Sequence, residues 1–229
     1  MGGTAVSPPA RRRPPAARLL RHDRALGARR VAGADEAGRG CLAGPLVAAA
    51  VCIDLERLGR AGARALRDLD DSKRLAPAAR ARLAAEIPRW ALRVAVVSVC
   101  PARIDSDGLH RCNLRALARA LHGVADRADI CLVDGFALGG EAPAHRRVVG
   151  GDARSFAIAA ASVVAKEARD RLMRGPVALA HPGYGFDEHV GYATPAHRRA
   201  IGRQGPCRVH RMSFRSSAWA VPAAAAPPA

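Results

Sequence analysis

The sequence predicts an α/β domain, and three observations support this fold class. Short apolar runs bounded by glycine or proline are typical of strands. Between them lie longer stretches with the apolar stripe of an amphipathic helix. Strands come first and then alternate with helices, as in an α/β domain. A chain of 229 residues, 49% of them hydrophobic, is long enough to bury one sizeable core.

The apolar runs predict four strands. We place them at residues 31–35, 45–53, 92–99 and 130–134. Helices are expected between them. Pro77 suits the first turn of a helix over residues 77–87 that Pro88 closes. A second helix, over residues 109–122, carries its leucines on one stripe.

The third helix has the clearest signals. Ser155 is a candidate N-cap, an apolar face follows it, and Gly175-Pro176 is expected to end the helix. More helix is expected after Thr194-Pro195.

Both ends of the chain have tail-like compositions. Residues 1–28 form a basic tail rich in proline, alanine and arginine, which we expect to be largely disordered. A short helix near residues 18–29 has leucines with which it could dock. We expect the folded domain to span residues 29–219 and residues 220–229 to form a second disordered tail.

The chain is strongly basic, with a formal net charge of +17. All but two of its 37 basic residues are arginine, the exceptions being Lys73 and Lys166, which indicates a coding bias as much as selection for charge. The excess still favours a nucleic-acid partner and salt-sensitive binding.

The six cysteines include no C-x-x-C pair, and several lie in apolar runs. Free thiols in a reduced intracellular protein are expected, and we therefore expect a cytoplasmic protein. Cys207 and His210 have ligand-like spacing, but no second pair accompanies them, which disfavours a zinc site. No apolar run is as long as a membrane helix requires.

The hexapeptide Asp35-Glu36-Ala37-Gly38-Arg39-Gly40 follows the first predicted strand. Adjacent carboxylates repel each other, and a cation relieves the repulsion. Hard divalent ions such as Mg²⁺ prefer carboxylate oxygens. The glycines on either side of Arg39 allow the backbone to approach a ligand, and its guanidinium can pair with phosphate. A solvated turn would also account for the hexapeptide taken alone.

Two more acids stand at element ends. Asp134 ends the fourth predicted strand, at the edge where open α/β sheets tend to bind ligands. Asp152 follows two glycines and precedes the third helix. Each could equally be an ordinary turn or cap residue. Asp35 and Glu36 can share a site only if their strand bends or ends there, because successive strand side chains point to opposite faces.

A series of sequence blocks resembles the ribonuclease HII family. The blocks are VAGADEAGRGCLAGPLVAAAVCI from Val31 to Ile53, Asp71-Ser72-Lys73, Leu132-Val133-Asp134-Gly135, Gly151-Asp152 followed by SFAIAAASVVAKEARDR, HPGYGFDEHVGYATPAH from His181 to His197, and His210-Arg211-Met212-Ser213-Phe214. They occur in the family's order and cover about residues 31–215. The resemblance implies a ribonuclease H-like mixed β-sheet flanked by helices, with a helical C-terminal part that closes over the site.

The resemblance also implies a function. The family's acidic set falls on Asp35, Glu36, Asp134 and Asp152, which would bind two divalent ions, Mn²⁺ or Mg²⁺. The enzyme would hydrolyse the RNA strand of RNA–DNA hybrids and incise duplex DNA 5′ to single embedded ribonucleotides, leaving 5′-phosphate and 3′-hydroxyl ends. A monomer is expected. Asp170 and Asp187 are weaker candidates, because surface ion pairing would explain Asp170.

Substrate-binding residues follow from the same blocks. Gly38, Arg39 and Gly40 match the family's loop that contacts the ribose 2′-hydroxyl, the group that distinguishes RNA from DNA. Tyr192 matches its junction-sensing tyrosine, whereas Tyr184 is expected to be structural. Lys73 is expected to contact a phosphate, although an exposed lysine without a role fits it equally well.

Two rival functions remain open. A related nuclease acting on branched or single-stranded DNA would keep the carboxylates but would not need the Gly-Arg-Gly loop. A non-catalytic nucleic-acid-binding protein would explain the charge but not four acids at the family's positions. Metal-dependent cleavage separates these classes.

Overall fold

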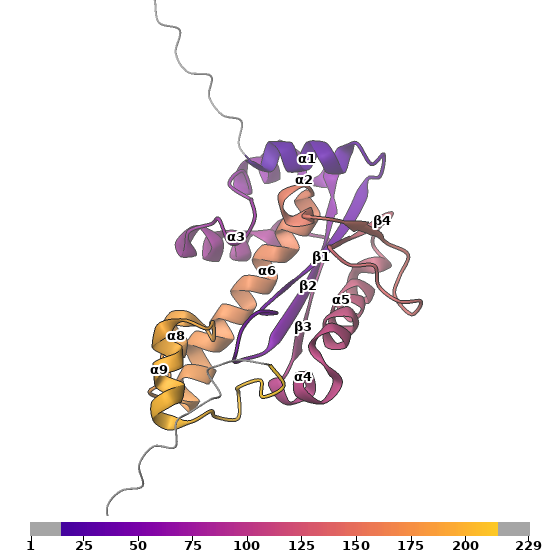
Figure 1. Cartoon of the computed structure of the whole chain (residues 1–229). Coiled ribbons are helices and arrows are strands. Elements are labelled where there is room, and N and C mark those ends of the chain that lie inside the picture. Colours follow the sequence, from indigo (N-terminus) through magenta and orange to yellow (C-terminus); the bar gives the residue numbers. More distant parts are fainter. Residues whose placement is uncertain (1–14, 215–229) are drawn as a thin grey trace, which may run out of the picture.

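The computed structural model describes residues 15–214, which form a five-stranded sheet with helices on both faces (Figure 1). The strands are β1 (Arg30–Ala37), β2 (Leu46–Asp54), β3 (Arg93–Val99), β4 (Ile130–Asp134) and β5 (Arg146–Val148). Their order in the sheet is β3-β2-β1-β4-β5. β1, β2 and β3 are antiparallel neighbours, whereas β4 lies parallel to β1 and β5 parallel to β4. The expected α/β fold with a mixed sheet is confirmed.

All four predicted strands are present, and β5 is the one that the pattern did not predict. β5 has only three residues, Arg-Arg-Val, and its two arginines are exposed. It therefore lacks the apolar run by which the other strands were recognised. β2 shows the strongest form of that signal, because all nine of its residues are buried.

Helices account for most of the remaining described residues. They are α1 (Pro15–Arg24), α2 (Leu55–Ala65), α3 (Pro77–Trp90), α4 (Pro101–Asp107), α5 (Leu109–Ala125), α6 (Phe156–Leu172), α7 (Ala178–Ala180), α8 (Phe186–His189) and α9 (Pro195–Gln204). A 3-10 turn (Gly151–Ala153) precedes α6, and a π-helical turn (Met173–Val177) follows it. None of the helices in residues 15–214 is both long and apolar enough to cross a membrane.

The two faces of the sheet have separate cores. α6 packs on one face, together with α1, α2 and α3, whereas α5 covers the other (Figure 1). α6 lies so close to β1 that a Cβ added to Gly33 would be 2.2 Å from the backbone nitrogen of Ile158. Glycine at this position therefore allows the central helix and the central strand to touch.

The helix boundaries agree with the prediction at their starts better than at their ends. Ser155 and Thr194 cap α6 and α9 by accepting backbone hydrogen bonds, as predicted. Pro88, however, lies inside the last turn of α3 rather than closing it. Gly175-Pro176 also does not end α6, because the chain continues helically through the π-helical turn into α7. Proline has no backbone N–H and leaves one helical hydrogen bond unformed, but the chain keeps its helical direction at both prolines.

The N-terminal boundary of the domain also requires a correction. The prediction placed residues 1–28 in a largely disordered tail, with a short helix near residues 18–29 that could dock through its leucines. That helix is present as α1, which starts before residue 18 and packs against α6. Leu19 and Leu20 are buried, and the buried carboxylate of Asp23 accepts hydrogen bonds from Ser155 Oγ at 3.1 Å and from Ala157 N at 2.9 Å. α1 is thus part of the core around α6. Residues 1–14 and the predicted tail at 220–229 lie outside the described residues.

All six cysteines are free thiols, and four of them are buried: Cys41, Cys52, Cys112 and Cys131. This agrees with the expectation of core thiols. Cys207 Sγ lies 3.2 Å from His210 Nδ1, and this histidine also accepts a hydrogen bond from the backbone N–H of Cys207. The cysteine and the histidine therefore contact each other directly.

Candidate active site

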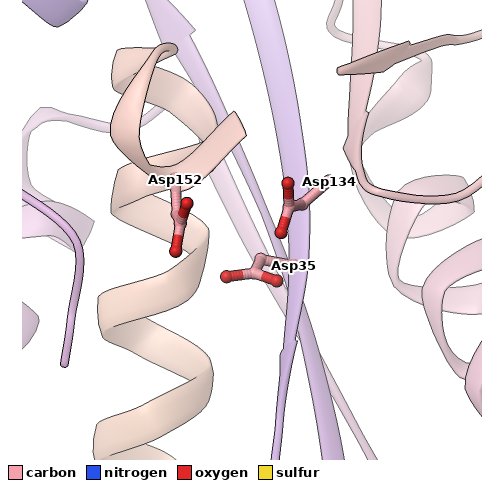
Figure 2. A group of neighbouring side chains, drawn as sticks. All are labelled: Asp35, Asp134 and Asp152. Carbon is pink, nitrogen blue, oxygen red and sulfur yellow. The ribbon is translucent and has the colours of Figure 1, made fainter. Parts of the chain in front are cut away.

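Three aspartates from separate parts of the chain meet at one edge of the sheet (Figure 2). Asp35 lies on β1, Asp134 ends β4, and Asp152 lies in the 3-10 turn before α6. One carboxylate oxygen from each lies within 4.8 Å of those from the other two, and no other group of three potential metal ligands this close occurs in residues 15–214. The parallel pairing of β1 with β4 accounts for the meeting of the first two.

A glycine turn brings Asp152 to the other two aspartates. Gly150 has a φ of 62°, in the left-handed region, and the next residue donates its backbone N–H to Asp134 Oδ1 at 2.6 Å. A Cβ added to Gly151 would lie 3.2 Å from that oxygen and 2.5 Å from Ile158 Cδ1. The turn is therefore built tightly on the end of β4.

Glu36 stands apart from this group. β1 continues as a strand to Ala37, with Glu36 paired to Ala48, so its side chain points to the face opposite that of Asp35. The bend expected near Gly38 lies beyond Asp35 and Glu36 in the sequence, so it does not bring these two carboxylates into one tight group. Glu36 Oε1 lies 3.7 Å from Arg39 Nη1, and its buried Oε2 has no hydrogen-bond partner.

Burial and mutual repulsion make these carboxylates hard to ionise. Burial raises the pKa of Asp35 well above its usual value, and the charges of Glu36 and Asp134 raise it further. Burial raises the pKa of Glu36 to about 7, although the charge of Arg39 opposes the shift. The pKa values of Asp134 and Asp152 are also raised, again mainly by burial. A bound cation would relieve this repulsion.

The residues present fit a hard divalent cation. The three aspartates supply only oxygen donors, which such ions prefer, and Glu36 Oε2 is a buried acceptor without a partner. Nitrogen and sulfur donors, which softer metals select, are absent from this group of three.

The Gly38-Arg39-Gly40 turn lies next to the acidic group, and its three residues have different surroundings. Gly38 has a φ of 90° and is buried, whereas Gly40 is exposed and a Cβ added to it would meet nothing within 4 Å. The Arg39 guanidinium carbon lies 4.8 Å from the centre of the Phe136 ring. Arg39 is therefore held against the protein, while Gly40 leaves open space for a ligand.

Lys73 and Tyr192 border the same region. Lys73 is exposed, and its charge lowers the pKa values of Glu36, Asp134 and Asp152. Tyr192 is 37% exposed, and Lys166 Nζ lies 5.2 Å from the centre of its ring. Tyr184 is buried, and its hydroxyl donates to Gly205 O at 2.7 Å, which supports a structural role.

The weaker acidic candidates lie outside the group. Asp170 is not at the surface, as was expected, but is buried and paired with Lys166 at 2.7 Å and Arg80 at 3.1 Å. Ion pairing does explain it, although in the interior. Asp187 is exposed on α8.

Two residues near the group were not predicted to contribute. A hydrogen bond with Ser162 lowers the pKa of Asp35, and this serine also bonds Ser72 Oγ at 2.9 Å. Asp71 raises the pKa values of Asp134 and Asp152 by its charge. Ser162 is the one hydroxyl residue in the apolar run from Phe156 to Ala165, a signal that could have identified it.

Comparisons with known proteins agree with one another. The family described as Ribonuclease HII matches residues 32–217. A Ribonuclease HII of Mycobacterium avium is 50% identical over 184 residues, which are 80% of this chain and 77% of the relative. One of Mycobacterium tuberculosis is 50% identical over 186 residues, 80% of this chain and 67% of the relative. The RNase HII in a complex with PCNA from Archaeoglobus fulgidus superposes with a TM-score of 0.65 at 27% identity, covering 81% of this chain and 95% of that one.

Proposed function

This chain belongs to the ribonuclease HII family, and from that premise we propose that it incises duplex DNA on the 5′ side of single embedded ribonucleotides. It is an endoribonuclease that hydrolyses the RNA strand of RNA–DNA hybrids. The products of incision would carry 5′-phosphate and 3′-hydroxyl ends. Such an incision would begin the removal of ribonucleotides from DNA.

The observation that carries the proposal is the convergence of Asp35, Asp134 and Asp152 beside the Gly38-Arg39-Gly40 turn. We assign the binding of divalent metal to these three aspartates and to Glu36. Enzymes of this family depend on divalent metal, and a two-ion site of Mg²⁺ or Mn²⁺ would supply an activated water and stabilise the leaving 3′ oxygen. The separate position of Glu36 suits a ligand on the opposite side of β1 from Asp35.

The chain's own residues would position the substrate. The exposed Gly40 leaves room for the ribose, whose 2′-hydroxyl would be recognised by backbone groups of the turn. Lys73, exposed and close to the carboxylates, would pair with the phosphate. The partly exposed ring of Tyr192 would stack on the sugar next to the ribonucleotide, at the junction with DNA.

The test uses a labelled DNA duplex with one ribonucleotide, incubated with Mg²⁺, Mn²⁺ or EDTA. We expect metal-dependent incision 5′ to the ribonucleotide and a loss of at least about 100-fold in Asp35→Asn. Asp129→Asn is the matched control, because this aspartate lies at the opposite end of β4, where it pairs with Arg30. The control should cleave like the wild type.

The rival functions predict different results. Binding of the duplex without incision under any metal would favour a non-catalytic binding protein. Equal cleavage of an all-DNA duplex would favour a nuclease of another specificity. Cleavage of a uniform RNA–DNA hybrid without incision at the single ribonucleotide would leave the family's activity in place but refute the proposed one.

A further inference from the structure

Two arginines, Arg169 on α6 and Arg211 near the C-terminal end of the described chain, are completely buried. Neither has a carboxylate within ion-pairing distance among residues 15–214, although Arg80, the third buried arginine of these residues, does. A buried charge without an acidic partner is costly unless hydrogen bonds compensate it. Burial lowers the pKa of Arg211 to about 10, in line with that cost. Their partners are instead backbone carbonyls.

Arg169 joins two loops that are far apart in the sequence. One is the segment from Gly38 to Pro45, here called the glycine loop, and the other is the segment from His189 to Tyr192, here called the tyrosine loop. Arg169 Nε donates to Pro45 O at 2.9 Å and Nη2 donates to Ala43 O at 3.0 Å, both in the glycine loop. Its Nη1 donates to Val190 O, in the tyrosine loop, at 2.9 Å.

Arg211 holds the glycine loop from another direction. Its Nε and Nη2 both donate to Gly44 O, at 3.0 and 2.8 Å, and its Nη1 donates to Arg39 O at 3.1 Å. The last of these bonds fixes the backbone of the Gly38-Arg39-Gly40 turn itself. The backbone N–H of Arg211 also donates to Leu42 O at 2.8 Å.

The two loops also touch each other directly. Leu42 N donates to Gly191 O at 2.9 Å, and a Cβ added to Gly191 would lie 2.4 Å from Ala43 O. Val190 has a φ of 45°, a strained conformation for a β-branched residue. Its carbonyl, which accepts from Arg169, helps to stabilise that conformation.

Both residues expected to sense the ribonucleotide border Arg169. A Cβ added to Gly38 would lie 2.1 Å from Arg169 Nε, so glycine is required here for the guanidinium to pass beneath the turn. On the other side, the guanidinium carbon of Arg169 lies 6.0 Å from the centre of the Tyr192 ring. One side chain thus separates and spaces the two recognition elements.

We propose that Arg169, which bonds both loops, and Arg211, which holds the glycine loop in place, are positioning residues that keep the glycine loop fixed beside the tyrosine loop and thereby set the selectivity for single ribonucleotides. Neither touches the substrate, because both are fully buried. To cleave at a single ribonucleotide, the enzyme must recognise the 2′-hydroxyl and the neighbouring DNA sugar together. Cleavage of this substrate therefore depends on the distance between the glycine loop and the tyrosine loop. A uniform hybrid offers many ribonucleotides and depends on it less.

The inference rests on the proposed function, and its test compares two substrates with Mg²⁺: a duplex with one ribonucleotide and a uniform hybrid of the same sequence. In Arg169→Gln and Arg211→Gln we expect kcat/KM to fall about 30-fold or more on the single ribonucleotide and less than about 5-fold on the hybrid, because small displacements of a positioned substrate are costly. Arg169→Lys, which keeps the charge and some donors, should lie between Arg169→Gln and the wild type. Mn²⁺ affinity, measured by calorimetry, should stay within about 3-fold of the wild type, since the metal ligands lie on other elements.

A matched control separates positioning from a loss of stability. Val124→Ala removes buried volume on α5, on the other face of the sheet, and should lower stability while keeping the ratio of the two activities. Equal losses on both substrates in the arginine variants, or the same change of ratio in Val124→Ala, would overturn the inference. If Arg169→Gln does not fold, the ratio of kcat/KM on the two substrates is measured in Arg169→Lys instead, and an unchanged ratio would overturn the inference.

The failure of the proposed function would look different. A wild-type enzyme that cleaves the hybrid but not the single ribonucleotide would refute the proposed function alone. The coupling between Arg169 and Tyr192 would then test the inference in the affinity for the single-ribonucleotide duplex, because the hybrid depends little on the spacing of the loops. The double variant Arg169→Gln/Tyr192→Phe should lose less than the product of the two single losses if Arg169 acts by positioning Tyr192. Independent, multiplying losses would refute it.

Discussion

The Nε2 atoms of His197 and His210 lie 3.1 Å apart in the buried C-terminal part of the protein. The backbone N–H of Cys207 donates to His210 Nδ1, so the proton of a neutral His210 ring resides on Nε2 and points to His197. The proton of His197 is then on Nδ1, 2.8 Å from the carbonyl of Tyr192. This arrangement favours two neutral rings. A second proton on His197 would set two N–H groups against each other at the Nε2 contact, and one on His210 Nδ1 would face the backbone N–H of Cys207.

Acid should therefore destabilise this part of the protein. Burial lowers the pKa of His197 to about 4 and lowers that of His210, so the unfolded state binds these protons at a higher pH than the folded state. Stability is then constant above the unfolded pKa of about 6.5 and is lost as the pH falls toward 4, by at most about 1.4 kcal/mol per pH unit for each ring.

The acidic group shifts stability in the opposite direction, so the histidine effect is measured as a difference. Denaturant unfolding of the wild type and of His197→Gln at pH 8, 6 and 5 isolates it. We expect the variant to be less stable at pH 8 and the gap to narrow at pH 5. A gap that is independent of pH would mean that His197 does not titrate in this range.

The docking of α1 should contribute measurably to stability. Asp23→Ala removes the acceptor for Ser155 Oγ and Ala157 N at the start of α6, and we expect a loss of about 1–2 kcal/mol in the free energy of unfolding. Asp23→Asn keeps an acceptor oxygen and should lose less. The exposed Arg24, the last residue of α1, provides the control, and Arg24→Ala should change stability by under about 0.5 kcal/mol. Equal effects at both positions would indicate that α1 is docked without this contact.

What the sequence could predict depended on how local each signal was. The strands β1, β2 and β4 follow from their apolar runs, and the starts of α6 and α9 from Ser155 and Thr194, because these signals act within a few residues. The leucines near residues 18–29 predicted a short helix that could dock, but not its place in the core, because that depends on Asp23 reaching the N-terminus of α6, 132 residues further along the chain. The short strand β5 also has no local signal, because it is defined by its pairing with β4.

The candidate site divides along the same line. Asp35 and Asp134 were each placed at a strand end, but only the resemblance to the family joined them and Asp152 in one site. The burial of Asp170 could not be predicted, because its partner Arg80 comes from α3, 90 residues away. Glu36 was expected beside Asp35 because the glycines suggested an earlier bend than the one β1 has.

Removing a catalytic carboxylate should stabilise the metal-free protein. Asp35 is buried among like charges, so its pKa is raised and the folded state binds its proton more tightly than the unfolded state. Its unfavourable contribution therefore grows as the pH rises through the folded pKa. In EDTA at pH 8 we expect Asp35→Asn to gain about 1 kcal/mol, which raises Tm by roughly 3 °C.

Metal and pH provide the controls for that gain. At pH 5 the difference in Tm should shrink, because the raised pKa of Asp35 leaves the folded wild type with more neutral carboxyl there than at pH 8. With Mg²⁺ or Mn²⁺ the wild type should gain stability by binding, and Asp35→Asn should gain less. A variant that is less stable than the wild type in EDTA at pH 8 would show that Asp35 is held mainly by favourable contacts.

Gly38→Ala and Gly40→Ala should both lower activity, but only the first should lower stability. Gly38→Ala forces a side chain into a φ of 90° and against Arg169, so we expect a loss of stability of about 2 kcal/mol or more together with activity. Gly40→Ala meets nothing within 4 Å in the protein and does not have a positive φ, so Tm should stay within about 2 °C of the wild type.

The activity of Gly40→Ala then reports on the substrate. If the ribose approaches the open side of the turn, the added methyl group should lower kcat/KM for a single ribonucleotide by about 10-fold or more without changing Mn²⁺ affinity. Thermal unfolding of the two variants checks the expected stabilities. Steady-state kinetics and calorimetry check the expected activity and Mn²⁺ affinity. A Gly40→Ala enzyme with wild-type kinetics would mean that the substrate does not come close to this side of the loop, and that Gly38 alone is needed as glycine.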